Sequence, residues 1–331
     1  MTEQTARFID RMLAGDRVAL AKLMTLVENR ESETAEVMSR LHQRAAATRI
    51  IGITGPPGAG KSTLVDRLIA TLRASGRRVG VVAVDPSSPF SGGAVLGDRI
   101  RMQSHFLDEG VFIRSLSARG SIGGLARAAR DIARLLGAFG HDTVLVETVG
   151  VGQNEFDIMR LADTVVVMLV PEAGDSIQAM KAGLLEIADV FVVNKSDRDG
   201  AARMKQELEN MLHLRAQRAW AVPVLLTVAV DGLGIPELLQ TLDAHHEHLV
   251  RSGDGAARLA AARHEEFVGA LREELGRLLD RALRDGWLGE LTAAVERGEI
   301  DPYCALQQVF ADGHVASALV QRGRPGGIGS S

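Results

Sequence analysis

The sequence predicts an α/β protein in which a mostly parallel central sheet is flanked by helices. From residue 49 to about 250, short apolar runs alternate with helical stretches, as in a parallel sheet wrapped by helices. The apolar runs are continuous rather than alternating, which is typical of strands buried on both faces. The first strand and the first helix of this region are joined by a glycine-rich segment with the G-x-x-x-x-G-K-[ST] pattern of a phosphate-binding loop.

The phosphate-binding loop covers residues 55–62, after an apolar strand at 50–54 and before a helical run at 62–72. Glycines let the backbone fold tightly, so that successive N–H groups and the helix N-terminus point at the phosphates. Lys61 supplies a positive charge for the β- and γ-phosphates, and Ser62 supplies a hydroxyl for Mg²⁺. The motif in this position predicts a P-loop NTPase. The nucleotide-binding candidates are Gly58, Ala59, Gly60, Lys61, Ser62 and Thr63.

Further strands are predicted at residues 78–84, 111–114, 143–146, 164–170, 190–193 and 223–227. Ligands of such sheets bind at the carboxyl ends of the strands, so polar residues there are candidates for function. Asp85 ends the second strand and Asp98 follows a Gly/Ser-rich stretch. Both are candidate Mg²⁺ ligands in a loop that moves with the nucleotide state. The alternative is local: Asp85 starts a turn and Asp98 caps a helix.

Glu147 follows the fourth strand, and Gly150 comes three positions later. In phosphate-loop nucleotidases this pairing forms the metal-side and γ-phosphate-sensing element. Glu147 replaces the commoner Asp, and its longer side chain can reach Mg²⁺ through a water; the Gly150 amide can contact the γ-phosphate. The residue after Gly150 is Val151, and Gln153 lies two positions further. No water-orienting residue is therefore assigned, and we expect slow intrinsic hydrolysis.

The sixth strand is followed by an N-K-x-D motif at residues 194–197. In a phosphate-loop protein this motif selects guanine, because the Asp197 carboxylate accepts hydrogen bonds from the ring N1–H and the C2 amine of guanine. Adenine has no donor at N1 and no amine at C2. Asn194 and Lys195 are expected to brace the base and its loop. Standing alone, the tetrapeptide could be a solvated turn. The loop after the last strand offers backbone amides on the base side, those of Val228 and Ala229.

Composition excludes several classes of protein. The net charge of −4, with interspersed signs, gives no basic field, so we expect no nucleic-acid partner. Cys304 is the single cysteine, which excludes an internal disulfide or a cysteine zinc cluster and suits a reducing compartment. No signal peptide is visible and no apolar run approaches the roughly twenty residues that span a membrane. We therefore expect a cytoplasmic protein without a membrane partner.

Helical segments are predicted on both sides of the nucleotide-binding region. The expected division is an N-terminal helical extension at 1–48, a P-loop GTPase domain at 49–250, a C-terminal helical arm at 251–322 and a disordered tail at 323–331. Asp16 is expected to cap a helix of the extension, which either covers the main domain or docks a partner. The arm carries an apolar stripe, typical of a core or of an interface, formed by Leu271, Leu275, Leu278, Leu279 and Leu283.

The chain resembles the MeaB family, also called ArgK, in the segments GPPGAGKST, VDPSSPFSGGAVLGD, VETVGVGQ, PEAGDSIQAMKAGLLE and NKSD. These GTPases, which include the human methylmalonic aciduria type A protein, accompany adenosylcobalamin-dependent acyl-CoA mutases. The resemblance extends from about residue 20 to the C-terminal helices. It implies GTP or GDP and Mg²⁺ as cofactors and a homodimer formed through the arm. It also implies an acidic Mg²⁺ shell of Asp85, Asp98 and Glu147, completed by Ser62.

The resemblance further implies that residues 171–181 are a third switch, which a partner mutase swings towards the nucleotide. A cation arriving there would stabilise charge on the transferred phosphoryl group, as an arginine finger does. In the isolated chain, Lys181 could instead lie on the solvated face of an amphipathic helix. The catalytic candidates are Lys61, Glu147, Gln178 and Lys181.

The expected function is that of a Mg²⁺-dependent GTPase serving as a chaperone for a methylmalonyl-, isobutyryl- or 2-hydroxyisobutyryl-CoA mutase. It would gate cofactor loading and protect or reactivate the mutase. The alternative is a GTP-dependent metallochaperone for a nickel or cobalt enzyme, to which the cluster of His245, His246 and His248 draws attention. No long histidine tract or cysteine pair accompanies this cluster. A protein kinase, as the older family name suggests, and a scaffold without turnover are further alternatives.

Overall fold

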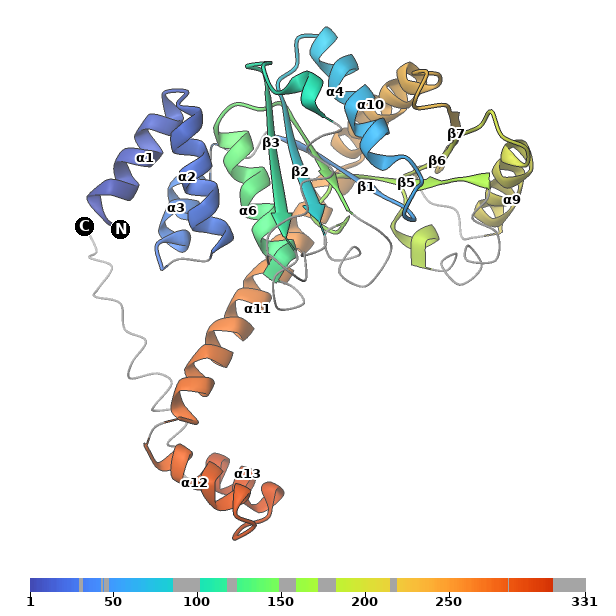
Figure 1. The fold of residues 1–331 in the computed structure, drawn as a ribbon. Coiled ribbons are helices and arrows are strands. Elements are labelled where there is room, and N and C mark those ends of the chain that lie inside the picture. The colour runs from blue at the N-terminus through green and yellow to red at the C-terminus, as the bar shows by residue number, and fades with distance from the viewer. Residues whose placement is uncertain are drawn as a thin grey trace. The chain divides into compact units, whose positions relative to one another are not determined.

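The computed structural model describes residues 1–29, 32–42, 44, 48–85, 102–117, 124–148, 159–171, 183–214, 219–284 and 286–311 (Figure 1). The strands are β1 Arg49–Thr54, β2 Val79–Asp85, β3 Val111–Ser117, β4 Thr143–Glu147, β5 Thr164–Leu169, β6 Val190–Asn194 and β7 Val224–Thr227. The helices are α1 Glu3–Leu13, α2 Arg17–Glu28, α3 Thr34–Leu41, α4 Lys61–Ala74, η1 Gln103–His105, α6 Gly124–Ala138, α9 Ala201–His213, α10 Ile235–Ser252, α11 Asp254–Ala282, α12 Gly286–Glu296 and α13 Pro302–Ala311.

The strands form one parallel sheet in the order β3-β2-β4-β1-β5-β6-β7. β1 lies between β4 and β5, with Ile53 opposite Glu147 and Ile51 opposite Thr164. The predicted α/β fold class and the predicted strands are confirmed, with bounds that shift by up to three residues. The chain fills one side of β1 first and then the other, so the strand order reverses there. Parallel sheets bind ligands at such a point, beyond the carboxyl ends of the strands.

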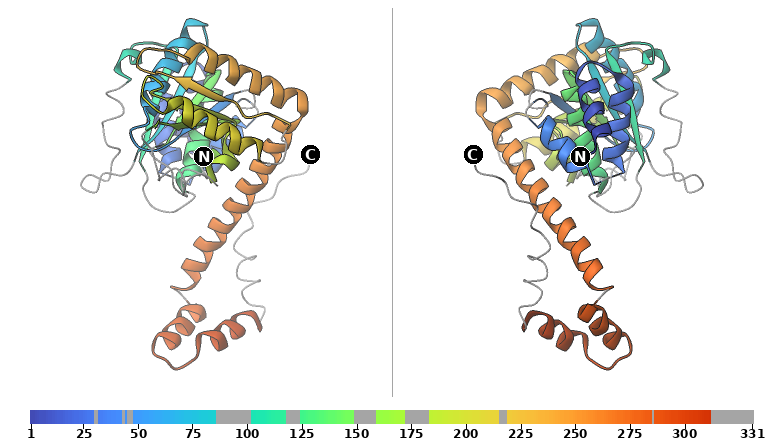
Figure 2. Two further views of the ribbon diagram at one scale, coloured as in Figure 1. Left: turned by 90° about the vertical axis from the view of Figure 1, so that its right-hand side faces the viewer. Right: turned by 90° about the vertical axis from the view of Figure 1, so that its left-hand side faces the viewer.

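Helices cover both faces of the sheet (Figures 1 and 2). On one face, Leu64 of α4 and Leu238 of α10 are buried against Ile51 and Val81. On the other face, α6 and α9 bury side chains such as Ile132 and Leu208 in a second core. Because both faces are covered, the strands are largely apolar, as the continuous apolar runs of the sequence predict.

The N-terminal helices α1, α2 and α3 belong to the core on the α6 face. Asp16 caps α2 as predicted, because its Oδ1 accepts hydrogen bonds from the amides of Val18 at 2.8 Å and Ala19 at 3.1 Å. Arg17 then reaches the start of β3, donating from Nη1 to the carbonyl of Glu109 at 2.9 Å. The described part of this extension is therefore a structural cover of the sheet's β3 side.

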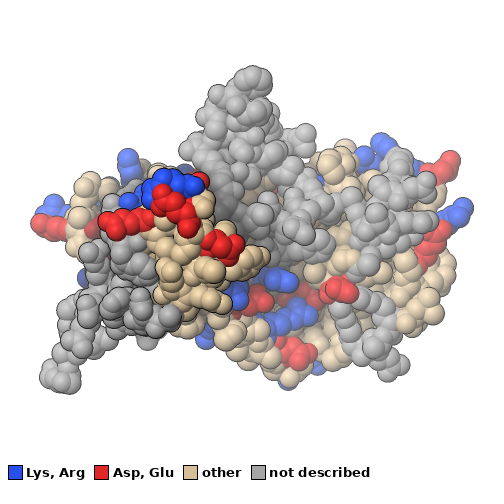
Figure 3. All heavy atoms as spheres, turned by 90° about the horizontal axis from the view of Figure 1, so that it is seen from below, with Lys and Arg blue, Asp and Glu red and all other residues tan. Residues whose placement is uncertain are grey.

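The chain divides into two compact units, residues 1–262 and 263–331. Helix α11 begins in the first unit and ends in the second, where Leu288 of α12 and Ala305 of α13 are buried. The predicted tail at 323–331 lies outside the described residues. None of the described helices has a stretch long and apolar enough to cross a bilayer. The surface seen in Figure 3 carries Lys and Arg side chains mixed with Asp and Glu, in accord with the small net charge.

Candidate nucleotide-binding site

The candidate site lies where the carboxyl ends of β1, β4, β6 and β7 meet. β1 ends at Thr54 and leads into the phosphate-binding loop, and the loop in turn leads into α4 at Lys61. Glu147, Asn194 and Thr227 are the last residues of β4, β6 and β7. Because all strands are parallel, these residues from distant parts of the chain gather at one edge of the sheet.

Two glycines of the phosphate-binding loop are required by its geometry. Gly60, the N-cap of α4, has φ of +93°, in the left-handed region that residues with a Cβ avoid. A Cβ built on Gly60 would lie 2.5 Å from Nδ2 of Asn194, and one built on Gly55 would overlap the carbonyl oxygen of Met168. The sequence motif therefore reflects both a backbone conformation and close packing. It places the positive N-terminal end of α4 at the loop.

Lys61 is nearly buried and its ammonium group is held by the loop itself. Nζ donates hydrogen bonds to the carbonyl oxygens of Gly55 at 2.8 Å and Pro56 at 3.0 Å. Lys61 is 6% exposed, so its charge lies against the loop rather than in bulk water. This is the position from which a lysine can approach phosphates bound by the loop amides. Thr63 follows in the first turn of α4.

Ser62 and Glu147, two of the candidate Mg²⁺ ligands, lie in contact. Oγ of Ser62 donates to Oε1 of Glu147 at 2.7 Å, and both side chains are buried. A hydroxyl and a carboxylate are the hard oxygen donors that Mg²⁺ prefers, so the donor set fits this ion. β2 runs beside β4 and brings the backbone of Asp85 to the same edge. The side chain of Asp85 lies outside the described part, as do four whole residues: Asp98, Gly150, Gln178 and Lys181.

Asn194 joins the phosphate-binding loop to the segment after β7. Its Nδ2 donates to the carbonyl of Ala59 at 2.8 Å, and its Oδ1 accepts from Thr227 Oγ1 and from the amide of Ala229, both at 3.0 Å. The side chain is 3% exposed. Asn194 thus joins the two loops through buried hydrogen bonds, and its role towards a base stays a prediction. Gly58 is the remaining predicted loop residue and is exposed.

The next residues of the N-K-x-D motif turn sharply. Lys195 has φ of +56°, which is uncommon for a residue with a Cβ and concentrates at functional sites. Asp197 is exposed, where a base could reach it. On the opposite loop, the Val228 amide donates to Leu233 at 3.1 Å. This bond occupies the Val228 amide, and Asn194 already accepts from the Ala229 amide. A base that binds here would therefore have to share the Ala229 amide with Asn194.

Arg67 is a residue of this site that the sequence analysis missed. It lies on the exposed face of α4, and its Nε donates to the carbonyl of Ala229 at 3.2 Å while its Nη2 donates to the carbonyl of Val230. An exposed arginine in a helix has no distinctive sequence pattern. Only the folding of the β7–α10 connection beside α4 reveals this contact.

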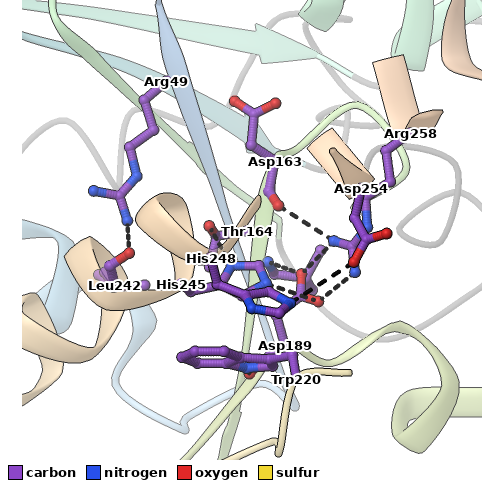
Figure 4. Close-up of polar contacts among 11 residues, drawn as sticks. Arg49, Asp163, Thr164, Asp189, Trp220, Leu242, His245, His248, Asp254 and Arg258 are labelled. Carbon is purple, nitrogen blue, oxygen red and sulfur yellow. Dashed lines mark hydrogen bonds and ion pairs between the residues drawn. The ribbon is translucent and has the colours of Figure 1, made fainter. Parts of the chain in front are cut away.

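The histidine cluster lies at the opposite, amino-terminal edge of the sheet (Figure 4). His245 is fully buried: its Nδ1 lies 2.9 Å from Thr164 Oγ1, and its ring packs 4.8 Å from that of Trp220. Its Nε2 lies 3.5 Å from Oδ1 of Asp189. In the described part of the chain, no group of three or more His, Cys, Asp or Glu side chains is placed to hold a metal ion. His245 is therefore a packing residue of the protein interior.

Comparison with known proteins identifies the family. The family model described as "Methylmalonyl Co-A mutase-associated GTPase MeaB" matches residues 20–283. The chain belongs to the MeaB family. It is 46% identical over 308 residues to a putative GTPase of Pyrococcus abyssi, covering 92% of this chain and 95% of that protein. It is 36% identical over 281 residues to the mouse methylmalonic aciduria type A homolog, covering 78% of this chain and 68% of that protein.

The MeaB-family fold is also seen in a solved structure. The crystal structure of a LAO/AO transport system kinase matches with a TM-score of 0.70 and 29% sequence identity, covering 96% of this chain and 99% of that one. The resemblance identified from the sequence motifs is thereby confirmed. Membership of a family of GTPases also makes a guanine nucleotide the ligand class of this MeaB-family site.

Proposed function

We propose that this MeaB-family chain is a Mg²⁺-dependent GTPase that acts as a chaperone for an adenosylcobalamin-dependent acyl-CoA mutase. It would gate cofactor loading and protect or reactivate the mutase. The observation that carries the proposal is the family match over residues 20–283, whose description names a mutase-associated GTPase. The site supports the GTPase part of the proposal. Ser62 contacts Glu147, and Asn194 ties the phosphate-binding loop to the loop after β7, on the base side of the site.

Each site residue has a proposed task. Lys61 and the loop amides bind the phosphates, and the Asp197 carboxylate selects guanine. Mg²⁺, when bound, would neutralise phosphate charge, held by Ser62 and Glu147 with Asp85 and Asp98 as further acidic ligands. Lys195 supports the base through the turn that its positive φ makes in the loop. Asn194 supports it through its hydrogen bonds to the loop after β7. Gly150 senses the γ-phosphate.

The partner would complete the catalytic machinery. We propose that the mutase moves residues 171–181 so that Gln178 and Lys181 approach the phosphates. A cation there stabilises the charge that develops during phosphoryl transfer, and this kind of contribution is worth about 10³-fold or more in other GTPases. Turnover by the chain alone would therefore be slow and would rise on binding of the mutase.

The decisive experiment measures GTP turnover by the purified protein, alone and with methylmalonyl-, isobutyryl- and 2-hydroxyisobutyryl-CoA mutases. We expect strong stimulation by one member of this panel, which would also identify the partner. Turnover unchanged by every mutase would contradict the chaperone role and leave the GTPase family assignment intact.

A variant tests the switch. Lys181→Ala should abolish the stimulation of GTP turnover by the mutase, because the arriving cation is lost. Turnover with the mutase would then equal turnover without it. The matched control is Lys205→Ala, which removes a lysine from α9, where it pairs only with Glu209 in the described structure. Normal stimulation of the Lys181 variant would show that the assigned switch residue is wrong.

A further inference from the structure

The base-side loop, defined as residues 228–234, is closed on itself by backbone hydrogen bonds. The amide of Val228 donates to the carbonyl of Leu233 at 3.1 Å, and the reverse bond measures 3.2 Å. A third bond joins the amide of Gly232 to the carbonyl of Ala229 at 3.3 Å. These bonds shape the loop internally, but they do not fix its orientation on the protein.

Few side chains of this loop attach it to the core. Val230 is 66% exposed and Leu233 is 61% exposed, whereas Ala229 is buried. The orientation of the loop next to the site must therefore come largely from polar contacts with its backbone. Within the described part of the chain, two side chains from outside the loop make such contacts.

Both backbone groups of Ala229 are held from outside the loop. Asn194 Oδ1 accepts from its amide at 3.0 Å, and Arg67 Nε donates to its carbonyl at 3.2 Å. Arg67 Nη2 also donates to the next carbonyl, that of Val230. The planar guanidinium thus spans two consecutive peptide groups, which fixes the rotation of the peptide planes. Asn194 is linked in turn to the phosphate-binding loop at Ala59.

We propose that Arg67 is a positioning residue for base recognition: by clamping the base-side loop to α4, it orients the loop for a guanine without touching the nucleotide. This inference rests on the proposed guanine-nucleotide function of the site. Pre-organisation of a binding loop raises affinity because less freedom is lost on binding. Since the clamp acts on the base side, its loss affects recognition of guanine more than binding of phosphates.

The test compares Arg67→Ala with the unmodified protein in equilibrium binding of GTP, with ATP as a competitor. ATP carries the same triphosphate and ribose on a different base. We expect GTP affinity to fall about tenfold while ATP affinity is unchanged, because Arg67→Ala removes two charge-assisted hydrogen bonds that orient the loop but none to the nucleotide. The GTP/ATP selectivity should fall by the same factor, and in turnover assays the loss should appear in KM rather than in kcat.

Two further variants sharpen the test. Arg73→Ala removes another arginine of α4, which bonds Asp108 and the carbonyl of Arg77, both at 2.8 Å and away from the loop. It should keep the selectivity of the unmodified protein. Arg67→Lys retains the charge without the fork, and should recover part of the selectivity.

Three outcomes would overturn the inference. If Arg67→Ala keeps its GTP/ATP selectivity, the clamp has no role in base recognition, although the proposed function stands. If GTP and ATP lose affinity equally, Arg67 acts through the phosphate side or the fold. If the unmodified protein does not prefer GTP to ATP, the guanine assignment fails, and the positioning role fails with it.

Discussion

Asn194 uses both ends of its buried side-chain amide to hold two loops together. Nδ2 donates to Ala59, and Oδ1 accepts from Thr227 and Ala229. A net hydrogen bond contributes about 1 kcal/mol, but leaving a buried partner unsatisfied costs more, so the residue type is strongly constrained. An aspartate here would lack the donor for Ala59 and would bury a charge. The neighbouring Asp197, by contrast, is exposed and available to a ligand.

Asp197→Asn should weaken the preference for GTP. The amide presents a donor where the guanine N1–H and exocyclic amine also donate, and it favours a xanthine base, whose C2 carbonyl accepts. Competition of GTP and XTP against labelled GDP measures the change. Asp199→Asn, an exposed acidic residue of the same turn, is the matched control and should keep the preference. An unmodified protein that binds ATP as well as GTP would contradict the guanine assignment.

Acid should destabilise the protein through His245. Burial lowers the pKa of His245 to about 4. Asp189 opposes this shift, whereas Arg258, Arg49 and His248 reinforce it. Below pH 6.5 the unfolded chain binds a proton that the folded protein refuses, so stability falls as pH falls from 6.5 towards 4. This single group removes about 2 kcal/mol of unfolding free energy between pH 7 and pH 5, measurable by urea denaturation.

Substitutions separate this contribution from others. His245→Gln should make the pH dependence of the unfolding free energy shallower, whereas His246→Gln, at the exposed neighbouring position, should leave it unchanged. His141 adds a similar slope in all variants, because burial lowers its pKa to about 4 as well. An unaltered slope in His245→Gln would show that this histidine titrates alike in the folded and unfolded chain.

At the scale of elements, the beginning of α11 is attached to the amino-terminal edge of the sheet (Figure 4). Arg258 of α11 makes a two-pronged contact with the Asp189 carboxylate at 2.9 and 3.1 Å. Asp189 precedes β6, is 3% exposed, and also accepts from the amide of Val165 at 3.0 Å. A buried carboxylate requires such a partner, so this ion pair holds the beginning of α11 against the start of β6 within the first unit.

Arg258→Ala should lower the free energy of unfolding by about 2 kcal/mol, since it leaves Asp189 buried without its cation; the half-exposed arginine reduces the cost below that of a fully buried pair. Denaturant titration measures it. Adding Asp189→Asn should recover part of the loss. Arg251→Ala, at an exposed position on α10, is the control. Equal stability of the Arg258 and Arg251 variants would contradict the anchoring role.

At the scale of the whole molecule, α11 carries an exposed apolar stripe within the second unit. Phe267, Leu271, Leu275 and Leu279 recur every four residues, and each is 42% exposed or more. Residues at this spacing share one helix face. The sequence left open whether the stripe is core or interface. Its exposure in the single chain favours an interface, and we propose that it joins two copies of the chain in a homodimer.

Charges placed on this stripe should separate the subunits. Leu271→Glu combined with Leu275→Glu introduces carboxylates that would be buried in the interface, so we expect a monomer where the unmodified protein is a dimer. Sedimentation velocity over a range of concentrations measures the assembly. Glu274→Ala, at an exposed position on the same helix, should remain dimeric. A monomeric unmodified protein, or a dimeric double variant, would exclude this interface.

The sequence by itself determined the elements and the ligand class. These features are local patterns: the apolar strand runs, the phosphate-binding loop and the N-K-x-D motif. Each can be recognised within a few consecutive residues, because backbone preference and burial act over that range. The tertiary structure decided which residues meet. Ser62 reaches Glu147, and Arg67 reaches Ala229, across long stretches of chain. These contacts depend on the strand order β3-β2-β4-β1-β5-β6-β7, which no local pattern contains. Because the strands are parallel, the starts of β5 and β6, which the histidine cluster contacts, lie at the edge away from the nucleotide site, and burial there makes His245 a packing residue.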